Sequence, residues 1–402
     1  MKKKIISLAL VIVMTLATLT SCMAIDFSGM LTPDEEKTPQ INNIYVEGGP
    51  TYGDINITST AEKNLLAASK AVLSTVSIFT SSSAGSGVIY ELDKSKGDAI
   101  VITNFHVVYN SEKNQIDSEI LLFLYGMEHM DYAIEAEYLG GSINYDIAIL
   151  KVSSSPVLVT SNARAVDVAD SNKVSILETA IAVGNPEASG ISATVGSISV
   201  DSEPITIAFE VKGETVVVEL RVMRTDAAVN GGNSGGGLFN DKGELIGIVN
   251  ARSSDTESHN IGYAIPSNVA VAIAENVKYY SERGSYKVHK CMLGITVTVS
   301  KMSSKYDETT GKLEKLETVS VMELSATSGA KGYLREGDVI NSITIDGVTH
   351  RVTRMYHVVD AMLYARVGST VTLNITRGGI TRDVTIPITQ SLLTDADKGI
   401  FD

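Results

Sequence analysis

Short apolar runs rich in β-branched residues alternate with turn-forming residues between Val76 and Pro266. Glycine, asparagine, aspartate and serine separate the runs, and no long helical stretch interrupts them. Short strands at this spacing are typical of an all-β barrel or sandwich, so the pattern predicts a mainly β fold. The clearest runs lie at residues 100–103, 147–152, 181–183, 216–222 and 245–249.

Three other segments have apolar residues at helical spacing. Residues 61–73 predict a helix that packs at the edge of the β structure, and residues 267–280 predict a second helix that is closed by Gly284. Residues 356–365 predict a third helix, because their apolar residues share one face. The residues on that face are Val358, Val359, Met362 and Leu363.

The N-terminus has the pattern of a targeting segment. Three lysines precede a mainly apolar stretch of fifteen residues at 5–19, which is shorter than the about 20 residues that a membrane helix needs. It ends in the sequence LTSC at 19–22, which resembles a bacterial lipobox, so residues 1–21 are predicted to be a lipoprotein signal peptide and Cys22 the lipid attachment site. The alternative is an ordinary signal peptide with an incidental cysteine. Residues 22–60 are polar and turn-rich, which predicts a flexible tether.

Composition excludes several classes of function. A length of 402 residues suggests roughly two or three domains, and the net charge of −14 argues against a nucleic-acid partner. The six histidines are scattered without metal-binding spacing, and no phosphate-binding glycine loop is present in the sequence, so we expect neither a metal site nor a cofactor. If Cys22 is lipidated, Cys291 has no partner for a disulfide, and a structural role for it is more plausible than a reactive one.

Candidate chemistry begins with Ser234, which lies among five glycines in residues 224–238. A serine hydroxyl flanked by unobstructed backbone amides suits acyl transfer, because the hydroxyl attacks a carbonyl and the amides bind the resulting oxyanion. Taken alone, the run could equally be a flexible Gly/Ser turn. A serine nucleophile also needs a base and a carboxylate that orients the base. His106 follows one apolar run and Asp146 precedes another, and the order His106, Asp146, Ser234 is that of the chymotrypsin-type proteases.

Several motifs in this order make the chain resemble a trypsin-like serine protease of the HtrA (Deg) family. They span residues 60 to 285 and are GSGV at 85–88, TNFHV at 103–107, DIAILK at 146–151, AVGNP at 182–186, TDAAVN at 225–230, GNSGG at 232–236 and NIGYAIPS at 260–267. The resemblance implies a protease domain at 61–284, built from two six-stranded barrels with the triad His106, Asp146 and Ser234 between them. It also implies an oxyanion hole at Gly232, Asn233 and Ser234, in which the amides of Gly232 and Ser234 are the donors. The implied specificity pocket has the uncharged Ala228 at its base and walls from Asn250, Ala251 and Arg252.

The chain departs from that family at two glycines and in one loop. Gly231 and Gly237 stand where many relatives carry proline, so both flanks of the nucleophile loop are expected to be loose. The run 90–99, which joins the two strands before His106, is short where relatives carry a long loop, so a large cage built through it is not expected.

Residues 288–390 resemble a PDZ domain in circularly permuted bacterial order, a β-sandwich with two helices, followed by a tail at 391–402. The resemblance implies a groove that takes a peptide C-terminus by strand addition. The groove residues would be Met292, Leu293, Gly294, Ile295, Val358 and Met362. The alternative is an ordinary strand start with a glycine at a close approach.

Taken together, these patterns predict an exported serine endopeptidase, anchored to the outer face of the bacterial membrane by Cys22. It would cleave unfolded proteins after small or medium apolar residues and bind peptide C-termini through the PDZ domain. Members of the family form trimers, so a homotrimer is one expected assembly. The rival interpretation is a lipid-anchored PDZ adaptor or chaperone with an idle protease fold. A solute-binding lipoprotein has no support beyond the lipobox.

Overall fold

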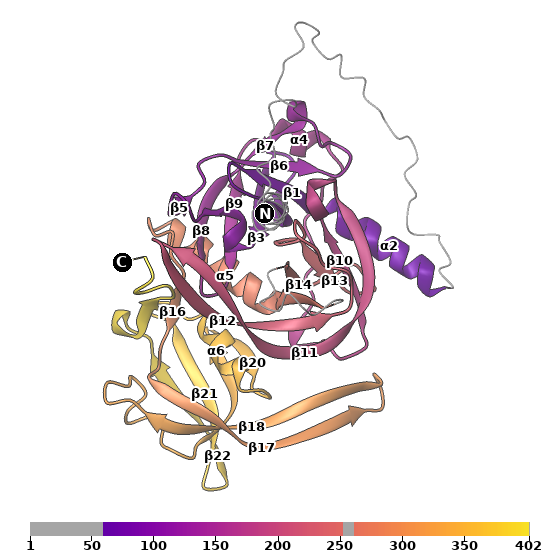
Figure 1. The fold of residues 1–402 in the computed structure, drawn as a ribbon. Helices are drawn as coiled ribbons and strands as arrows, with labels where there is room; N and C mark the ends of the chain where they lie inside the picture. Colours follow the sequence, from indigo (N-terminus) through magenta and orange to yellow (C-terminus); the bar gives the residue numbers. More distant parts are fainter. Residues whose placement is uncertain (1–58, 252–260, 402) are drawn as a thin grey trace, which may run out of the picture. The chain divides into compact units, whose positions relative to one another are not determined.

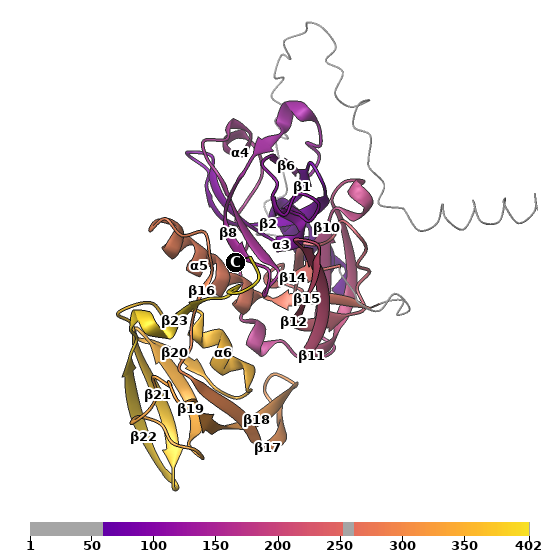
Figure 2. The ribbon, with the colours of Figure 1, turned by 60° about the vertical axis from the view of Figure 1, so that its left-hand side comes forward.

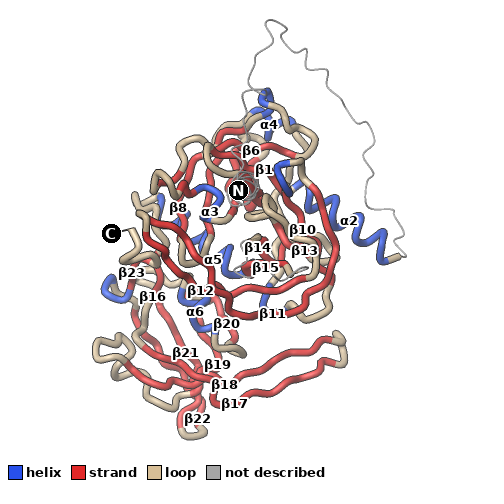
Figure 3. The backbone as a smooth tube through the Cα atoms, in the orientation of Figure 1, coloured by secondary structure: helices blue, strands red, loops and turns tan. Residues whose placement is uncertain are grey.

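The computed structural model describes residues 59–251 and 261–401, and it confirms a mainly β protein (Figures 1 and 3). The described residues belong to one compact unit. The predicted signal peptide, the lipid attachment site Cys22, nearly all of the tether and Arg252 lie outside these residues. None of the described helices is long and apolar enough to cross a membrane.

The first layer is a seven-stranded antiparallel sheet with the order β7-β6-β1-β2-β3-β9-β8. It is therefore not the closed six-stranded barrel that the resemblance implies. The turn from β2 to β3 spans only residues 94–97, so the short connection expected there is present. The strands are β1 (Thr75–Thr80), β2 (Ala84–Asp93), β3 (Asp98–Thr103), β6 (Ile120–Leu124), β7 (Ile134–Glu135), β8 (Glu137–Ser142) and β9 (Ile147–Val152), with a separate hairpin of β4 (Tyr109–Asn110) and β5 (Gln115–Ile116).

The second layer is a closed six-stranded barrel, in agreement with the expectation for this half. Its order is β10-β11-β12-β15-β14-β13. The hairpin of β11 and β12 is the longest of the barrel, and their pairing continues out to Val211 and Glu214. The strands are β10 (Thr179–Gly184), β11 (Ser192–Val211), β12 (Glu214–Thr225), β13 (Gly237–Phe239), β14 (Leu245–Asn250) and β15 (Gly262–Pro266).

Helices cover the edges of these two layers. The helix α2 (Thr60–Leu73) begins with a capping box between Ser59 and Glu62 and contacts β10, β11 and β13, as its apolar pattern predicts. The helix α5 (Ser267–Ser281) buries Val269, Ile273 and Val277. The remaining short helices are α3 (Phe105–Val108), α4 (Pro156–Thr160), η2 (Met130–Tyr132), η3 (Ser171–Lys173) and η4 (Pro186–Ala188).

The C-terminal part is a six-stranded sheet with an apolar core of its own. The strands are β17 (Ile295–Asp307), β18 (Lys312–Leu324), β19 (Val339–Ile345), β20 (Val348–Arg351), β21 (Thr370–Arg377) and β22 (Ile380–Pro387). Among described residues 288–390, α6 (Tyr356–Met362) is the only α-helix, so the expected second helix is wrong: residues 325–338 are mainly turns. Val359 is 54% exposed and does not share the buried face of Val358 and Met362, because successive residues point about 100° apart around a helix.

The segment after residue 387 is ordered and contains more than a simple tail. It forms η5 (Gln390–Leu392) and β23 (Leu393–Asp395), and β23 pairs with β16 (His289–Cys291). Cys291 is buried in this region, and burial raises the pKa of its thiol to about 11. A thiol with so high a pKa holds its proton at neutral pH and is unreactive, in keeping with a structural role.

Candidate active site

His106 and Asp146 form a buried hydrogen-bonded pair. His106 lies on the single-turn helix α3, directly after β3, and Asp146 lies directly before β9. The ring atom Nδ1 of His106 is 2.7 Å from Oδ2 of Asp146, and the backbone N–H of His106 donates to Oδ1 at 3.0 Å. Asp146 is fully buried, whereas the His106 side chain is 10% exposed. This geometry leaves Nε2 of His106 as the nitrogen that can act as a base.

Two buried asparagines hold Asp146 in place. Asn104 Nδ2 donates to the Asp146 carbonyl at 2.8 Å, and Asn250 Nδ2 donates to Oδ2 at 2.8 Å. Asp146 has a φ of +47°, a left-handed conformation that costs free energy for a residue with a side chain and persists only when neighbours fix it. The Asn250 side chain, at the end of β14, thus helps to hold Asp146, and the place in the specificity pocket that the resemblance implies for this residue stays a prediction.

Ser234 lies in the loop that joins β12 to β13 of the closed barrel. Its Oγ accepts a hydrogen bond from the amide of Ala251 at 3.1 Å, and the residue is 6% exposed. In the described part of the chain, no hydrogen bond joins Oγ to His106. Nucleophile and base are often this loosely arranged before substrate binds.

Two backbone amides beside Ser234 are unoccupied. Among residues 59–251 and 261–401, the amides of Gly232 and Ser234 have no hydrogen-bond partner, whereas the Asn233 amide donates to the Asn230 carbonyl at 3.1 Å. The structure therefore leaves the Gly232 and Ser234 amides available as oxyanion donors and engages that of Asn233 elsewhere. Gly232 has a φ of +92°, and a Cβ there would lie 2.2 Å from the Asn185 carbonyl oxygen, so only glycine fits.

Ser86, within the GSGV motif, connects the first sheet to the nucleophile loop. Its amide donates to the Ser234 carbonyl at 2.8 Å, and its hydroxyl donates to the Gly232 carbonyl at 2.8 Å. The same hydroxyl accepts from the Asn185 amide at 2.8 Å. No local pattern indicates a role for this serine, because the residues that it contacts lie far away in the chain.

The flanks of the loop differ from the expectation. Gly231 has open space around it, which suits a mobile flank. Gly237 instead lies inside β13, fully buried, and a Cβ there would lie 2.3 Å from the Phe239 ring. The expected looseness at Gly237 is therefore wrong, because strand pairing and the Phe239 ring hold it.

The predicted specificity pocket is only partly described. Ala228 is exposed, and its carbonyl accepts a hydrogen bond from Thr194 Oγ1 at 2.8 Å. Ala251 is half-buried beside Ser234, and Arg252 lies outside the described residues. The pocket as a whole stays a prediction.

The predicted peptide groove lies at the edge strand β17. The amides of Leu293 and Gly294 have no partner among the described residues, whereas the Met292 amide donates to the Leu392 carbonyl at 2.7 Å. Gly294 has a φ of +72°, and a Cβ there would lie 2.7 Å from Ser328 Cα. Val358 and Met362 are buried in the C-terminal core, and their helix α6 packs on β19 and β20.

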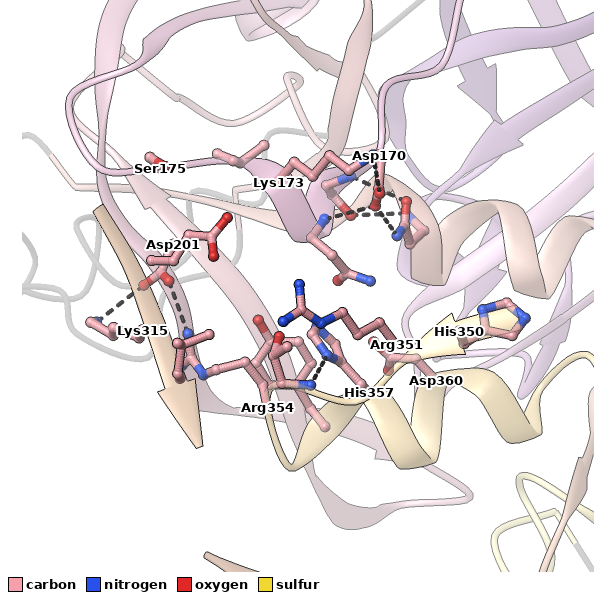
Figure 4. A pocket seen from close by; sticks show the side chains of 18 of the residues that line it. Asp170, Lys173, Ser175, Asp201, Lys315, His350, Arg351, Arg354, His357 and Asp360 are labelled. Carbon is pink, nitrogen blue, oxygen red and sulfur yellow. Dashed lines mark hydrogen bonds and ion pairs between the residues drawn. The ribbon is translucent and has the colours of Figure 1, made fainter. Parts of the chain in front are cut away.

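A cavity of about 700 Å³ lies apart from the candidate triad, between the barrel and the C-terminal sheet (Figure 4). Arg354 and Lys315 both reach Asp201 of β11, at 3.0 and 3.1 Å. Arg221 of β12 pairs with Asp360 of α6 at 2.6 Å. Burial lowers the pKa of His357 to about 4, so it is neutral near pH 7. Charged side chains that include Asp201, Lys315, Arg354 and Asp360 form part of the cavity lining, and within the described residues no group of three His, Cys, Asp or Glu side chains could hold a metal ion.

Comparisons with known proteins agree with this geometry. Residues 85–248 match the family model of the trypsin-like peptidase domain. The serine protease Do-like HtrA of Lactococcus lactis subsp. lactis is 36% identical over 278 residues, which cover 67% of this chain and 62% of that protein. The periplasmic pH-dependent serine endoprotease DegQ of Escherichia coli is 34% identical over 261 residues, which cover 64% of this chain and 50% of that protein.

A solved structure extends the similarity to most of the chain. The HtrA-type protease AlgW with tripeptide is 26% identical, with a TM-score of 0.52, over 85% of this chain and 99% of that one. By contrast, the matches to the HtrA of Lactococcus lactis and to DegQ cover less than two thirds of the length of those two proteins. The chain carries a trypsin-like peptidase domain and is a relative of the HtrA serine proteases.

Proposed function

We propose that this protein is a serine endopeptidase in which Ser234 is the nucleophile, His106 the base and Asp146 the carboxylate that orients the base. The observation that supports it most directly is the buried hydrogen bond between His106 and Asp146. The same protein has a serine, Ser234, whose own amide and that of Gly232 have no hydrogen-bond partner among the described residues. The rival, an adaptor with an idle fold, has no specific observation in its favour.

The proposed mechanism follows from the geometry. His106 Nδ1 faces Asp146, so Nε2 takes the Ser234 proton as Oγ attacks the substrate carbonyl, and Asp146 stabilises the imidazolium. Oγ accepts a hydrogen bond from the Ala251 amide, and its own proton must turn toward Nε2 for the transfer. The Gly232 and Ser234 amides bind the oxyanion, and one such donor contributes about 3–4 kcal/mol. His106 then protonates the leaving amine, and water hydrolyses the acyl-enzyme by the reverse proton transfers.

The proposed substrates are unfolded exported proteins, cleaved after small or medium apolar residues. Ala228 has no charge that would select lysine or arginine, and apolar pockets discriminate weakly. Export is supported by the basic and apolar N-terminal pattern and by relatives that are named periplasmic endoproteases. We further propose lipidation at Cys22, on the lipobox alone.

We also propose that the C-terminal sheet is a PDZ domain that binds peptide C-termini. Its support is the unpartnered amides of Leu293 and Gly294 beside the edge strand β17, because free amides bind a carboxylate and an edge strand accepts another strand.

Replacing Ser234 with alanine removes only the nucleophilic oxygen and should lower turnover of unfolded casein about 10⁶-fold, because loss of a triad member has an effect of that size. Cleavage is measured by mass spectrometry of the cut sites. The control is Ser304→Ala, an exposed serine on β17. Residual Ser234→Ala activity within tenfold of wild type would reject the assignment, and a wild-type protein that cleaves nothing would favour the adaptor.

Replacing Ser86 with alanine should lower kcat about tenfold with little change in KM. The change leaves the buried Gly232 carbonyl and Asn185 amide without a partner, and an unsatisfied buried group costs about 1–3 kcal/mol. The matched control is Ser77→Ala, because Ser77 lies opposite Ser86 on β1 and its buried hydroxyl makes no hydrogen bond. Equal kinetics for the two variants would show that the Ser86 contacts do not support the loop.

Peptides that end in an apolar residue with a free carboxylate should bind full-length Ser234→Ala protein at least tenfold more tightly than their amidated forms. Hydrogen bonds to a charged group contribute about 1.5–3 kcal/mol, which the amide forfeits. Calorimetric titration measures both affinities. Equal affinities would exclude carboxylate capture. Gly294→Val is a poor test, because the clash with Ser328 would strain the loop itself.

Replacing Cys22 with serine should move the protein from the membrane fraction to the soluble fraction with its peptidase activity intact, because lipid chains would be its anchor. Cys291→Ser, which alters the other cysteine, should stay with the membrane. A Cys22→Ser protein that remains in the membrane with its N-terminus uncut would point to a membrane helix instead.

A further inference from the structure

The last residues of the described chain contact the first protease sheet beside the candidate triad. After β23 pairs with β16, residues 396–401 run to β8, as the yellow segment near the C-terminus shows in Figure 2. Nothing in the predicted function uses this segment.

Asp397 forms the first of two contacts. The residue is 8% exposed, and its carboxylate accepts hydrogen bonds from Ser142 Oγ at 2.6 Å, the Ile143 amide at 3.0 Å and the Asn144 amide at 3.2 Å. Asn144 Nδ2 also donates to Asp397 Oδ1 at 3.2 Å and to the Ala396 carbonyl at 2.8 Å. Burial raises the pKa of Asp397, whereas these donated hydrogen bonds oppose the rise. A buried carboxylate with several donors from one short loop fixes the shape of that loop.

That loop is the one that presents Asp146. The amide of Ile143 donates to Asp397, and the carbonyl of Ile143 accepts from the Asp146 amide at 3.1 Å. Ile143 itself is fully buried. Because Asp146 has a positive φ, its conformation depends on the contacts that surround it. Asp397 therefore supports the strained turn through the backbone of Ile143.

Phe401 forms the second contact, with aromatic residues that flank His106 in the sequence. Its ring centroid lies 6.0 Å from that of Phe105 and 5.9 Å from that of Tyr109. Phe105 precedes His106 on α3, and Tyr109 follows the helix. The Phe401 carbonyl also accepts a hydrogen bond from Lys212 Nζ at 2.9 Å, in the turn between β11 and β12. The two contacts thus support both members of the His106–Asp146 pair.

We propose that residues 396–401 are a positioning element of the active site, in which Asp397 sets the turn that orients Asp146 and Phe401 supports the helix that carries His106. This inference rests on the proposed peptidase function. Because the segment continues from the C-terminal sheet, the same contacts join that sheet to the catalytic residues. Asp397 and Phe401 touch no substrate and act through the residues that they hold.

The decisive variant is Asp397→Asn in the full-length chain. It keeps the shape of the side chain but turns an N–H₂ group toward the Ile143 amide, the contact that leads to Asp146. We expect a 10- to 100-fold loss in kcat with KM changed less than about threefold, because small displacements of catalytic groups cost up to about 10²-fold. The rate at which a sulfonyl fluoride sulfonylates Ser234, with loss of fluoride, should fall by the same factor. The low-field proton resonance of the His106–Asp146 hydrogen bond should shift or broaden.

The matched control is Asp383→Asn, which makes the same chemical change at an exposed aspartate on β22. It should retain wild-type kinetics and the wild-type resonance. Phe401→Ala provides the second variant, with an expected loss in kcat of about 3- to 10-fold, and it decides the question if Asp397→Asn does not fold. All assays are run well below each unfolding midpoint.

The outcomes separate the inference from the proposed function. A folded Asp397→Asn protein that keeps wild-type kcat, sulfonylation rate and resonance would overturn the inference, and so would a lowered unfolding temperature without those changes. A wild-type protein that neither cleaves casein nor reacts with the sulfonyl fluoride would instead overturn the proposed function. The resonance is read without turnover, so it tests the positioning role in either case.

Discussion

The arrangement of the candidate site depends on one buried carboxylate, that of Asp146. An unpaired buried charge is very costly, so this group must be surrounded by donors wherever the chain supplies them. Here the donors come from both layers: the amide and ring of His106 from the first sheet, and the side chain of Asn250 from the end of β14 in the closed barrel. One carboxylate therefore ties the two layers together at the point where the proposed base and nucleophile meet, and its positive φ makes it sensitive to every neighbour.

Most glycines of the nucleophile loop are needed because the loop backbone lies very close to neighbouring backbone, and not because the loop must be flexible. A Cβ on Gly235 would lie 2.1 Å from the Ser86 carbonyl oxygen, and one on Gly232 would lie 2.2 Å from that of Asn185. The backbone of the loop can therefore press against β2 and the turn after β10, where Ser86 fastens it. Gly231, in open space, is the glycine left to provide freedom of movement.

The C-terminal sheet contacts the two N-terminal layers through ion pairs and buried hydrogen bonds. The sequence of the segment that joins these parts does not predict such contacts. Arg221 and Asp360 pair with side chains only 16% and 15% exposed, so this pair is shielded from solvent more than an ordinary surface ion pair is. Asp201 bonds both Arg354 and Lys315, and the final residues reach the turn before Asp146. A change in the position of α6 or of residues 396–401 would thus act on the long barrel hairpin and on the candidate site.

The sequence by itself determined the mainly β class, the helices α2 and α5 and the candidate residues His106, Asp146 and Ser234, because strand spacing, apolar periodicity and dense local motifs are properties of neighbouring residues. It did not reveal that the first layer stays a seven-stranded sheet, that only one α-helix accompanies the described C-terminal sheet, or that Gly237 is locked inside a strand. It also missed Ser86 and Asp397 and the contact of Asn250 with Asp146, because each of these residues bonds to one more than a hundred positions away. Such partners are chosen by the packing of distant segments, and no local pattern records which buried donor will face which buried acceptor.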